Sequence, residues 1–330
     1  MADTLTIPDA ETLVSDALVR ANTAPDNARY VASALVRAEA DGLKGHGLSR
    51  VPSYAAQAKA GKIDGHATPT LERPRPAVAA IDAAHGFAYP ALALALTALP
   101  AMARDSGLAA AAIRRSHHCG AAGLFVEDLA SQGLVALLFA NTPAAIAPWN
   151  GKRAVFGTNP IAFACPLPGR EPIVVDLSLS KVARGNIVAA KQRNEPIPEG
   201  WAVDAEGRPT TDATAALAGT MLPLGDAKGT ALALMVELLA AGLTGSTFAA
   251  DASSFLDDKG GPPGTGQLIL AFAPEAFGEG TLDRFALLAA SIEDQPGARL
   301  PGQRRLGLRR KAEREGLAVD PKLLAEIAAI

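Results

Sequence analysis

The sequence predicts a folded protein of the mixed α/β class, and three observations carry this prediction. The 330 residues are 49% apolar and 20% charged, which is enough apolar material to bury a sizeable core. Apolar residues at helical spacing occupy the N-terminal part, whereas short apolar runs alternate with helical segments further on. No G-x-G-x-x-G motif follows a predicted strand, so we expect any dinucleotide site to be built without a standard Rossmann unit.

Proline residues mark the beginnings of the first three expected helices. Pro8 opens a helix that reaches about residue 22, Pro25 opens the second, and Pro52 lies early in a third that ends near residue 60. Turn-forming residues over 65–76 then indicate a domain boundary, and a short strand follows at 77–82.

Strands and helices alternate through the middle of the chain. We expect helices at 89–105 and 124–131, and strands at 108–113, 134–141, 161–165 and 173–177. The segment 228–243 is apolar on all sides, which predicts a helix that is buried on most of its faces. A strand at 267–273 and helices at 281–293 and 321–330 complete the chain.

Composition excludes several classes of partner. The net charge of −3 offers no basic face for nucleic acid or an anionic membrane, so we expect small molecules or further copies of the chain as partners. The N-terminus has no basic segment followed by an apolar run, and no stretch reaches membrane-spanning length, which favours a cytoplasmic location. Cys119 and Cys165 are too few for a disulfide framework and have no zinc-like spacing, so we expect packed thiols and no metal.

The densest chemistry lies in the ten residues 45–54, which combine His46, Arg50 and Tyr54. Arg can grip a carboxylate with two hydrogen bonds, His can move a proton near neutral pH, and Tyr can orient or donate. Their spacing of four residues would align the three side chains on one helical face. Alone, His46 is more often a structural residue and Arg50 a surface charge; together they favour a carboxylate site.

A second candidate is the run from Arg115 to Gly123, which follows a strand and precedes a helix. Its small residues allow a ligand close to the backbone, and amide N–H groups at a helix start suit an anionic group. A loop without function is the alternative. The adjacent His117 and His118 point in different directions, so we do not expect them to share a metal.

Four further segments are candidates for ligand binding, and each also has an interpretation that is purely structural. Thr158 lies at a strand entrance, where capping of a turn is the alternative, Asp176-Leu177-Ser178 end a strand, and Asp226-Ala227 open a helix that Asp226 could cap. The basic run 299–311 is typical of a solvated helix, with phosphate binding by Arg299, Arg304 or Arg305 as the competing interpretation.

Taken together, these blocks resemble the malate/L-lactate dehydrogenase family of the non-Rossmann type, which includes sulfolactate and ureidoglycolate dehydrogenases and cyclic imine reductases. The resemblance extends from about residue 13 to residue 305. Within the family, the chain looks most similar to the Δ1-pyrroline-2-carboxylate/Δ1-piperideine-2-carboxylate reductases. The most specific blocks are 45–54, 118–123, 141–143 with 147–149, 156–163, 197–201, and 222–225 with 232–239.

The resemblance implies an architecture and an assembly. It implies a helical domain made from both chain ends, a cofactor domain on a large mixed, mainly antiparallel sheet, and a homodimer whose partner helps to form the site. We therefore expect a helical domain over 1–66 and 281–330, a small α/β segment over 67–115 and an NAD(P)-binding domain over 116–280.

The resemblance also implies roles for individual residues. Arg50 would hold the substrate carboxylate, with Tyr54 and His118 near the substrate and His46 in a proton relay. The cofactor would be NADPH, with NADH as the alternative, and basic residues such as Lys181 and Arg184 could meet a 2′-phosphate. The expected cofactor contacts are His118, Cys119, Gly120, Ala121, Ala122, Thr158, Asp176, Leu177, Ser178, Asp226, Ala227, Arg299, Leu300, Pro301, Gly302, Gln303, Arg304 and Arg305.

Two departures from the family pattern bear on the reaction. Gly45 replaces the Ser that usually precedes the relay His, and Asn186 stands where imine-reducing relatives carry Asp, which leaves His46 with neutral neighbours. Because a cyclic imine can arrive already protonated, it needs mainly hydride and positioning. We therefore expect reduction of a cyclic imine 2-carboxylate, from Δ1-pyrroline-2-carboxylate to L-proline or from Δ1-piperideine-2-carboxylate to L-pipecolate. The alternatives are a 2-hydroxy acid dehydrogenase of the malate, lactate or ureidoglycolate type, and an inactive cofactor-binding relative.

Overall fold

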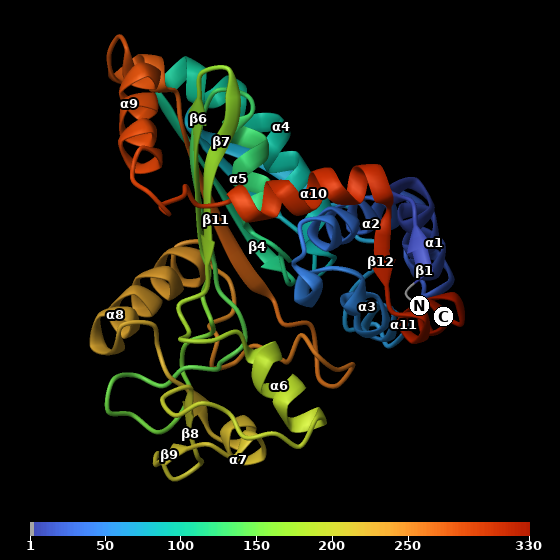
Figure 1. Cartoon of the computed structure of the whole chain (residues 1–330). Coiled ribbons are helices and arrows are strands. Elements are labelled where there is room, and N and C mark those ends of the chain that lie inside the picture. The colour runs from blue at the N-terminus through green and yellow to red at the C-terminus, as the bar shows by residue number, and fades with distance from the viewer. Residues whose placement is uncertain (1–2) are drawn as a thin grey trace.

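A seven-stranded sheet forms the centre of the molecule in a computed structural model that describes residues 3–330 (Figure 1). Only the neighbours β3 and β4 run parallel; the other five pairs are antiparallel. This confirms the mixed α/β class with a large, mainly antiparallel sheet. The strands, in spatial order, are β2 (Thr70–Arg75), β3 (Val78–Asp82), β4 (Leu108–Ser116), β11 (Thr265–Phe272), β5 (Val135–Ala140), β6 (Ile161–Leu167) and β7 (Arg170–Leu177).

Two helices, α4 (Ala88–Ser106) and α5 (Gly123–Ala130), pack against this sheet. The strands are rich in Ala, and alternate residues such as Ala109 and Ala111 on β4 are fully buried. Small side chains let a helix approach the sheet closely, because interior packing leaves few voids. The loop from β4 to α5 is thereby held firmly beneath the helical part of the molecule.

The two chain ends form a helical lobe, as expected. Strand β1 (Asp3–Leu5) pairs with β12 (Leu317–Val319), so the termini lie side by side (Figure 1). Thr6 and Asp320 cap the helices that follow them by accepting backbone N–H groups. The helices of this lobe are α1 (Ile7–Arg20), α2 (Pro25–Ala40), α3 (Val51–Lys59) and α11 (Pro321–Ala328), and α10 (Gln303–Glu315) leads into it from the sheet.

A smaller lobe lies at the other end of β6 and β7 (Figure 1). It has its own apolar core, which includes Ile146, Ile187 and Met221. The chain enters this lobe after β5 and returns before β6, then enters again after β7. The elements of this lobe are α6 (Arg184–Gln192), β8 (Ala202–Val203), β9 (Pro209–Thr210), α7 (Ala213–Ala218), β10 (Thr220–Met221) and α8 (Asp226–Glu237). Helix α9 (Thr281–Glu293) packs near the hairpin of β6 and β7, at the opposite end.

Two expectations about single elements are wrong. The segment 65–76, expected as turns because of its prolines, contains the edge strand β2, where Pro74 is tolerated because an edge has no partner on one side. Helix α8 packs on the lobe through residues such as Ala233 and Val236, whereas Leu234 of α8 and Leu238, the residue that follows α8, are 46% and 54% exposed. An all-apolar helix is therefore not buried here within the single chain.

The domain division by residue range stays a prediction. Strands of the expected segment 67–115 and of the expected cofactor domain 116–280 share one sheet, and α9 of the expected helical domain packs against β6. Within residues 3–330, no helix combines the length and apolar character needed to cross a membrane.

Candidate active site

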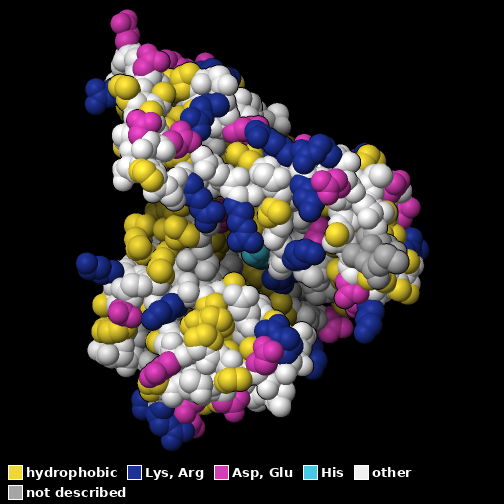
Figure 2. All heavy atoms as spheres, in the orientation of Figure 1, with side chains coloured by type: hydrophobic (Ala, Val, Ile, Leu, Met, Phe, Trp, Pro, Cys, Tyr) yellow, Lys and Arg dark blue, Asp and Glu magenta, His cyan; other side chains and the backbone are white. Residues whose placement is uncertain are grey.

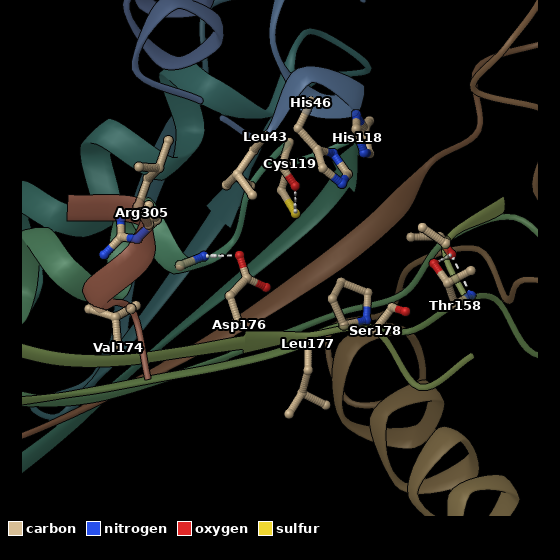
Figure 3. Close-up of a pocket in the computed structure, with 18 residues that line it drawn as sticks. Leu43, His46, His118, Cys119, Thr158, Val174, Asp176, Leu177, Ser178 and Arg305 are labelled. Atoms are coloured by element: carbon tan, nitrogen blue, oxygen red, sulfur yellow. Dashed lines mark hydrogen bonds between the residues drawn. The ribbon is translucent and has the colours of Figure 1, made fainter. Parts of the chain in front are cut away.

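A cleft of about 320 Å³ lies where the helical lobe, the sheet and the smaller lobe meet. Figure 2 shows a His side chain at the bottom of this hollow, with Lys and Arg side chains around its rim. Figure 3 shows that its labelled residues come from chain segments far apart: His46 precedes α3, His118 follows β4, Asp176 lies near the end of β7, and Arg305 lies on α10. Residues from several of the sequence motifs thus meet at one cavity.

The segment 44–50 does not form the single helix that the spacing suggested. It makes two 3₁₀ turns, Lys44–His46 and Leu48–Arg50, before α3 begins at Val51. The break has a local cause: the backbone N–H of Leu48 donates to the carboxylate of Glu39 at 3.1 Å, and a Cβ at Gly47 would lie only 3.0 Å from Glu39 Cα. His46 and Tyr54 nevertheless approach the same neighbour, His118.

His118 connects the aromatic residues of the cleft. Its ring stacks on that of His46 at a centroid distance of 5.3 Å, and its Nδ1 lies 2.6 Å from Tyr54 Oη. Tyr54 Oη in turn lies 3.1 Å from Tyr89 Oη. Tyr54 is fully buried and Tyr89 is 3% exposed, so this hydrogen-bonded chain is closed to water and fixes the His118 ring.

Burial sets the protonation of this group. Burial, assisted by the positive charge of Arg50, lowers the pKa of His46 to about 4 and holds the pKa of His118 well below its usual value. Burial likewise raises the pKa of Tyr54 to about 12. At pH 7 both imidazoles are therefore neutral and the phenol keeps its proton. Nδ1 of His46 is buried and has no hydrogen-bond partner among the described residues.

The positive charge of Arg50 contributes to the lowered pKa of both His46 and His118. Its Nε–H donates to the carbonyl oxygen of Gly45 at 2.7 Å, which fixes the side chain. No hydrogen bond within residues 3–330 occupies its terminal nitrogens, so they remain available for a carboxylate. A Cβ at Gly45 would meet no atom within 4 Å, so the missing Ser side chain leaves open space.

The loop after β4 approaches the end of β7 very closely. The backbone N–H of Gly123 donates to Asp176 Oδ2 at 2.7 Å, and a Cβ at Gly123 would lie 2.9 Å from Asp176 Cβ. Gly120 has a left-handed backbone with φ +68°, and a Cβ there would lie 2.6 Å from Tyr89 Oη. These glycines are required by space and by conformation. They bring the backbone at the start of α5 to the cleft, where the Gly123 N–H is bonded to Asp176.

Hydroxyl groups line the part of the cleft toward the smaller lobe. The backbone N–H of Thr158 donates to Thr142 Oγ1 at 2.9 Å, and the two Thr hydroxyls lie 3.3 Å apart. Ser178 Oγ lies 3.0 Å from Ser180 Oγ. Asp176 is open to solvent within the cleft, but the surrounding protein raises its pKa through desolvation. This wall therefore offers neutral hydrogen-bonding groups and one carboxylate.

Cys119 and Cys165 are both buried and unbridged, as expected of packed thiols. Burial raises the pKa of Cys119 to about 12, so its thiol keeps its proton although Cys119 lines the cleft.

Arg305 lines the cleft but is already bound to two carboxylates. Its guanidinium donates to Asp41 at 2.8 Å and to Glu127 at 2.7 Å, and Arg309 bonds to both of the same acids. At Arg305 and Arg309, the basic run is therefore not freely solvated. Both guanidinium groups are already paired with carboxylates, so neither is an unpaired phosphate ligand. Gly302 lines the same cleft.

The expected site residues divide into two groups by position. Part of the set lines the cleft, namely His46, His118, Cys119, Gly120, Ala121, Thr158, Asp176, Leu177, Ser178, Gly302 and Arg305. The rest does not line it, namely Gly45, Arg50, Tyr54, Ala122, Asn186, Asp226, Ala227, Arg299, Leu300, Pro301, Gln303 and Arg304. Leu300, Pro301 and Gln303 instead border a separate hollow with residues 169–173. The roles of both groups stay predictions.

Asn186 and His46 are not joined by a hydrogen bond in the described chain. Asn186 lies on the first turn of α6, three residues after Ala183, which lines the cleft. The expected pairing of an amide with the relay imidazole is thus not formed in this conformation.

Sequence reasoning assigned no site role to Tyr89 and did not single out Thr142 by itself. Thr142 follows the end of strand β5, as Asp176 lies near the end of β7, so the strand-end argument applied to both. Tyr89 carries no such signal, because a Tyr near the start of an Ala-rich helix is usually a core residue.

Comparison with known proteins gives three full-length similarities. The chain matches the family described as malate/L-lactate dehydrogenase over residues 5–328. It is 51% identical over 329 residues to (2R)-3-sulfolactate dehydrogenase (NADP(+)) of Chromohalobacter salexigens, covering 100% of this chain and 98% of that protein. It is 40% identical to Δ1-pyrroline-2-carboxylate reductase of Ancylobacter novellus, covering 99% and 97%.

The fold is similar to that of solved enzymes. The structure of Δ1-piperideine-2-carboxylate reductase from Pseudomonas syringae pvar. tomato superposes with a TM-score of 0.94 at 37% identity, covering 99% of each chain. A sulfolactate dehydrogenase from Methanocaldococcus jannaschii gives a TM-score of 0.89 at 30% identity, covering 98% of this chain and 95% of that one.

Proposed function

The chain belongs to the malate/L-lactate dehydrogenase family, as its motifs led us to expect, and from this premise we propose that it interconverts (2R)-3-sulfolactate and 3-sulfopyruvate with NADP(H). The observation that carries the proposal is the neutral imidazole of His46 in the cleft, whose pKa is lowered by burial and by the positive charge of Arg50. The 51% identity to a sulfolactate dehydrogenase, against 40% for an imine reductase, supports the choice of substrate.

The residues of the cleft suit oxidation of a 2-hydroxy acid. The terminal nitrogens of Arg50 hold the carboxylate, which places the C2 hydroxyl near the two imidazoles. Neutral His46 accepts the hydroxyl proton, since its pKa of about 4 leaves a ring nitrogen unprotonated at neutral pH. When bound, the nicotinamide supplies the acceptor for the C2 hydride, or its donor in the reverse reaction.

The cleft also fits a dinucleotide. Gly120 and Ala121 leave the backbone accessible, and Thr142 and Thr158 add hydroxyls. These groups are the kind that bind phosphate and ribose. A 2′-phosphate needs a cation in addition, and the Nε of Arg184, which follows the lining residue Ala183, has no hydrogen-bond partner within the described chain. We propose NADP(H), with NAD(H) as the alternative.

The neutral amide of Asn186 is compatible with an anionic substrate. A carboxylate at this position would stabilise the positive charge of a protonated imine, whereas it would repel the sulfonate of sulfolactate. The neutral amide removes that repulsion. Gly45 leaves open space beside His46, because a Cβ there meets nothing within 4 Å. Both departures from the family pattern are therefore compatible with a substrate that carries two anionic groups.

The second candidate is the cyclic imine reductase expected from the sequence. It would reduce Δ1-pyrroline-2-carboxylate to L-proline or Δ1-piperideine-2-carboxylate to L-pipecolate. Several relatives that carry these names are 37–42% identical to the chain. A substrate that brings its own proton depends less on a relay, which is the specific argument from Gly45 and Asn186 for this candidate.

A substrate panel decides between the candidates. Initial rates of NADPH and NADH oxidation are measured with 3-sulfopyruvate, both cyclic imines, oxaloacetate and pyruvate. We expect kcat/KM for 3-sulfopyruvate to exceed the others by about 100-fold, the range that a charged group recognised by the site can provide. A preference for either imine would replace the proposal by the second candidate. Binding of nucleotide without turnover of any substrate would support the inactive relative.

A further inference from the structure

One buried carboxylate takes no part in the chemistry above. Glu237 is the last residue of α8 and is 4% exposed. Its Oε1 accepts from Asn141 Nδ2 at 3.1 Å and from the backbone N–H of Ala249 at 2.6 Å, and its Oε2 accepts from Asn159 Nδ2 at 2.8 Å. No Lys or Arg of the described chain forms an ion pair with it. Three N–H donors therefore stabilise a carboxylate whose pKa is raised by burial.

The contacts of Glu237 lead directly to the wall of the cleft. Asn159, held through its Nδ2, uses its Oδ1 to accept the backbone N–H of Thr142 at 3.3 Å. Thr142 Oγ1 accepts the backbone N–H of Thr158 at 2.9 Å, and both Thr residues line the cleft. Asn159 is fully buried and has a left-handed backbone with φ +38°. This conformation is strained for a non-Gly residue, so it depends on the bonds that its amide makes.

Glu237 also joins the points where the chain leaves and re-enters the sheet. Asn141 directly follows β5, Asn159 lies just before β6, and Asn141 Oδ1 accepts the backbone N–H of Gly266 on β11 at 2.8 Å. After Glu237, α8 continues as a π-helical turn over Leu238–Gly242. Such turns are rare in proteins, and those that do occur are often found at functional sites. One side chain thus connects α8 with three strands of the sheet and with both Thr residues.

We propose that Glu237 is a positioning residue that sets the affinity for NADP(H) by fixing the Thr142–Thr158 pair. This inference rests on the proposed function in so far as the cleft binds the nucleotide. A carboxylate is required rather than an amide because all three of its partners are N–H donors. In a Gln side chain, the amide nitrogen would face another donor and at least one of these bonds would be lost.

The test is direct binding of the nucleotide to the purified protein. NADPH fluorescence is titrated for the wild type, for Glu237→Gln and for the matched control Glu313→Gln, whose carboxylate is exposed on α10. We expect Glu237→Gln to raise Kd for NADPH about tenfold, as the loss of one charged hydrogen bond would, while the control binds as the wild type does. KM for NADPH should rise equally, with kcat and KM for the acid substrate within about twofold.

A second variant and a second measurement keep the proposal falsifiable. Thr142→Val removes the acceptor for the Thr158 N–H without touching Glu237, so it should raise Kd for NADPH even if Glu237→Gln does not fold. Hydrogen exchange in the apo protein should be faster over residues 141–159 in Glu237→Gln than in the control. Unchanged Kd in both variants would overturn the proposal. So would a fall in kcat and in thermal stability that comes together with a rise in KM for the acid substrate. A wild type that binds neither nucleotide would refute the proposed function before any variant is made.

Discussion

His46 is in the neutral form that a general base needs. Its Nδ1 is buried and has no hydrogen-bond partner among the described residues, and its ring is held by stacking on His118. Because burial and Arg50 both disfavour the imidazolium, the base is present in its active form over the whole physiological pH range. In the proposed reaction, Arg50 would therefore have two effects: it would hold the carboxylate, and its charge would add to the effect of burial that keeps His46 neutral.

The pH dependence of the two directions follows from this protonation state. Since the pKa of His46 is lowered to about 4, the neutral base persists until the pH falls toward that value. We expect kcat/KM for 2-hydroxy acid oxidation to be level between about pH 6 and 8, and kcat/KM for 2-oxo acid reduction to rise as the pH falls, because reduction requires the imidazolium. Rate profiles in both directions test this. An oxidation limb with a pKa near the ordinary 6.5 would contradict it.

Gly45 and Asn186 offer a test of what selects the substrate. A Cβ at Gly45 has free space and its backbone is not left-handed, so Gly45→Ser should fold normally. We expect the double variant Gly45→Ser, Asn186→Asp to favour the imine. The kcat/KM for the imine, divided by the kcat/KM for 3-sulfopyruvate, should rise by at least about tenfold, because a carboxylate near the cleft favours an iminium and repels a sulfonate.

The two single variants serve as controls for the double variant, and thermal unfolding checks that each one folds. If the ratio is unchanged in all three, these positions do not select the substrate.

Helix α10 is tied to the rest of the molecule by a buried network of charges. Arg305 and Arg309, one turn apart, both bind Asp41 at the end of α2 and Glu127 on α5. The Asp41 and Glu127 side chains are 0% and 4% exposed. Such a network contributes little in net stability, but removing one member leaves a buried charge without its partner. It also determines where Arg305 stands in the cleft wall.

We expect Glu127→Gln to lower the free energy of unfolding by about 3 kcal/mol, since it leaves part of the charge of two guanidinium groups uncompensated. The matched control is Glu171→Gln, which breaks the exposed 3.8 Å pair with Arg310 and should cost less than about 1 kcal/mol. Urea unfolding measures both. Equal effects of the two substitutions would show that the buried network is not what holds α10.

Local signals explain which elements could be predicted. Pro25 and the periodicity that follows it fix α2, and the apolar run after residue 134 fixes β5, because both depend on neighbouring residues only. The pairing of Arg305 with Asp41 joins residues 264 positions apart, so no local pattern could reveal it. The two 3₁₀ turns before α3 depend on Glu39, which belongs to the preceding helix. The family motifs predicted several residues that line the cleft. The long-range contacts that hold those residues in place could be identified only from the structure.

The surface around α8 leaves large apolar side chains exposed. Figure 2 shows hydrophobic side chains gathered near α8, and Leu232, Leu234, Met235 and Leu238 are 39–54% exposed. Contiguous apolar patches of this kind mark interaction sites, because single chains rarely leave them in water. The apolar segment 228–243 would be buried on most of its faces, as its sequence predicted, if a second copy of the chain covered this surface. This agrees with the homodimer that the family resemblance implies.

We therefore predict a homodimer whose contact includes the exposed face of α8. Leu234→Glu combined with Leu238→Glu places two charges in that contact and should convert the dimer to a monomer, as read by size-exclusion chromatography with light scattering. Val19→Glu, at a 40% exposed apolar position on α1, is the matched control and should leave the assembly unchanged. A monomeric wild type, or a double variant that stays dimeric, would exclude this face. Because Glu237 directly precedes Leu238, a contact here would also brace the carboxylate that holds the cleft wall, so the monomeric variant should bind NADPH more weakly than the control does.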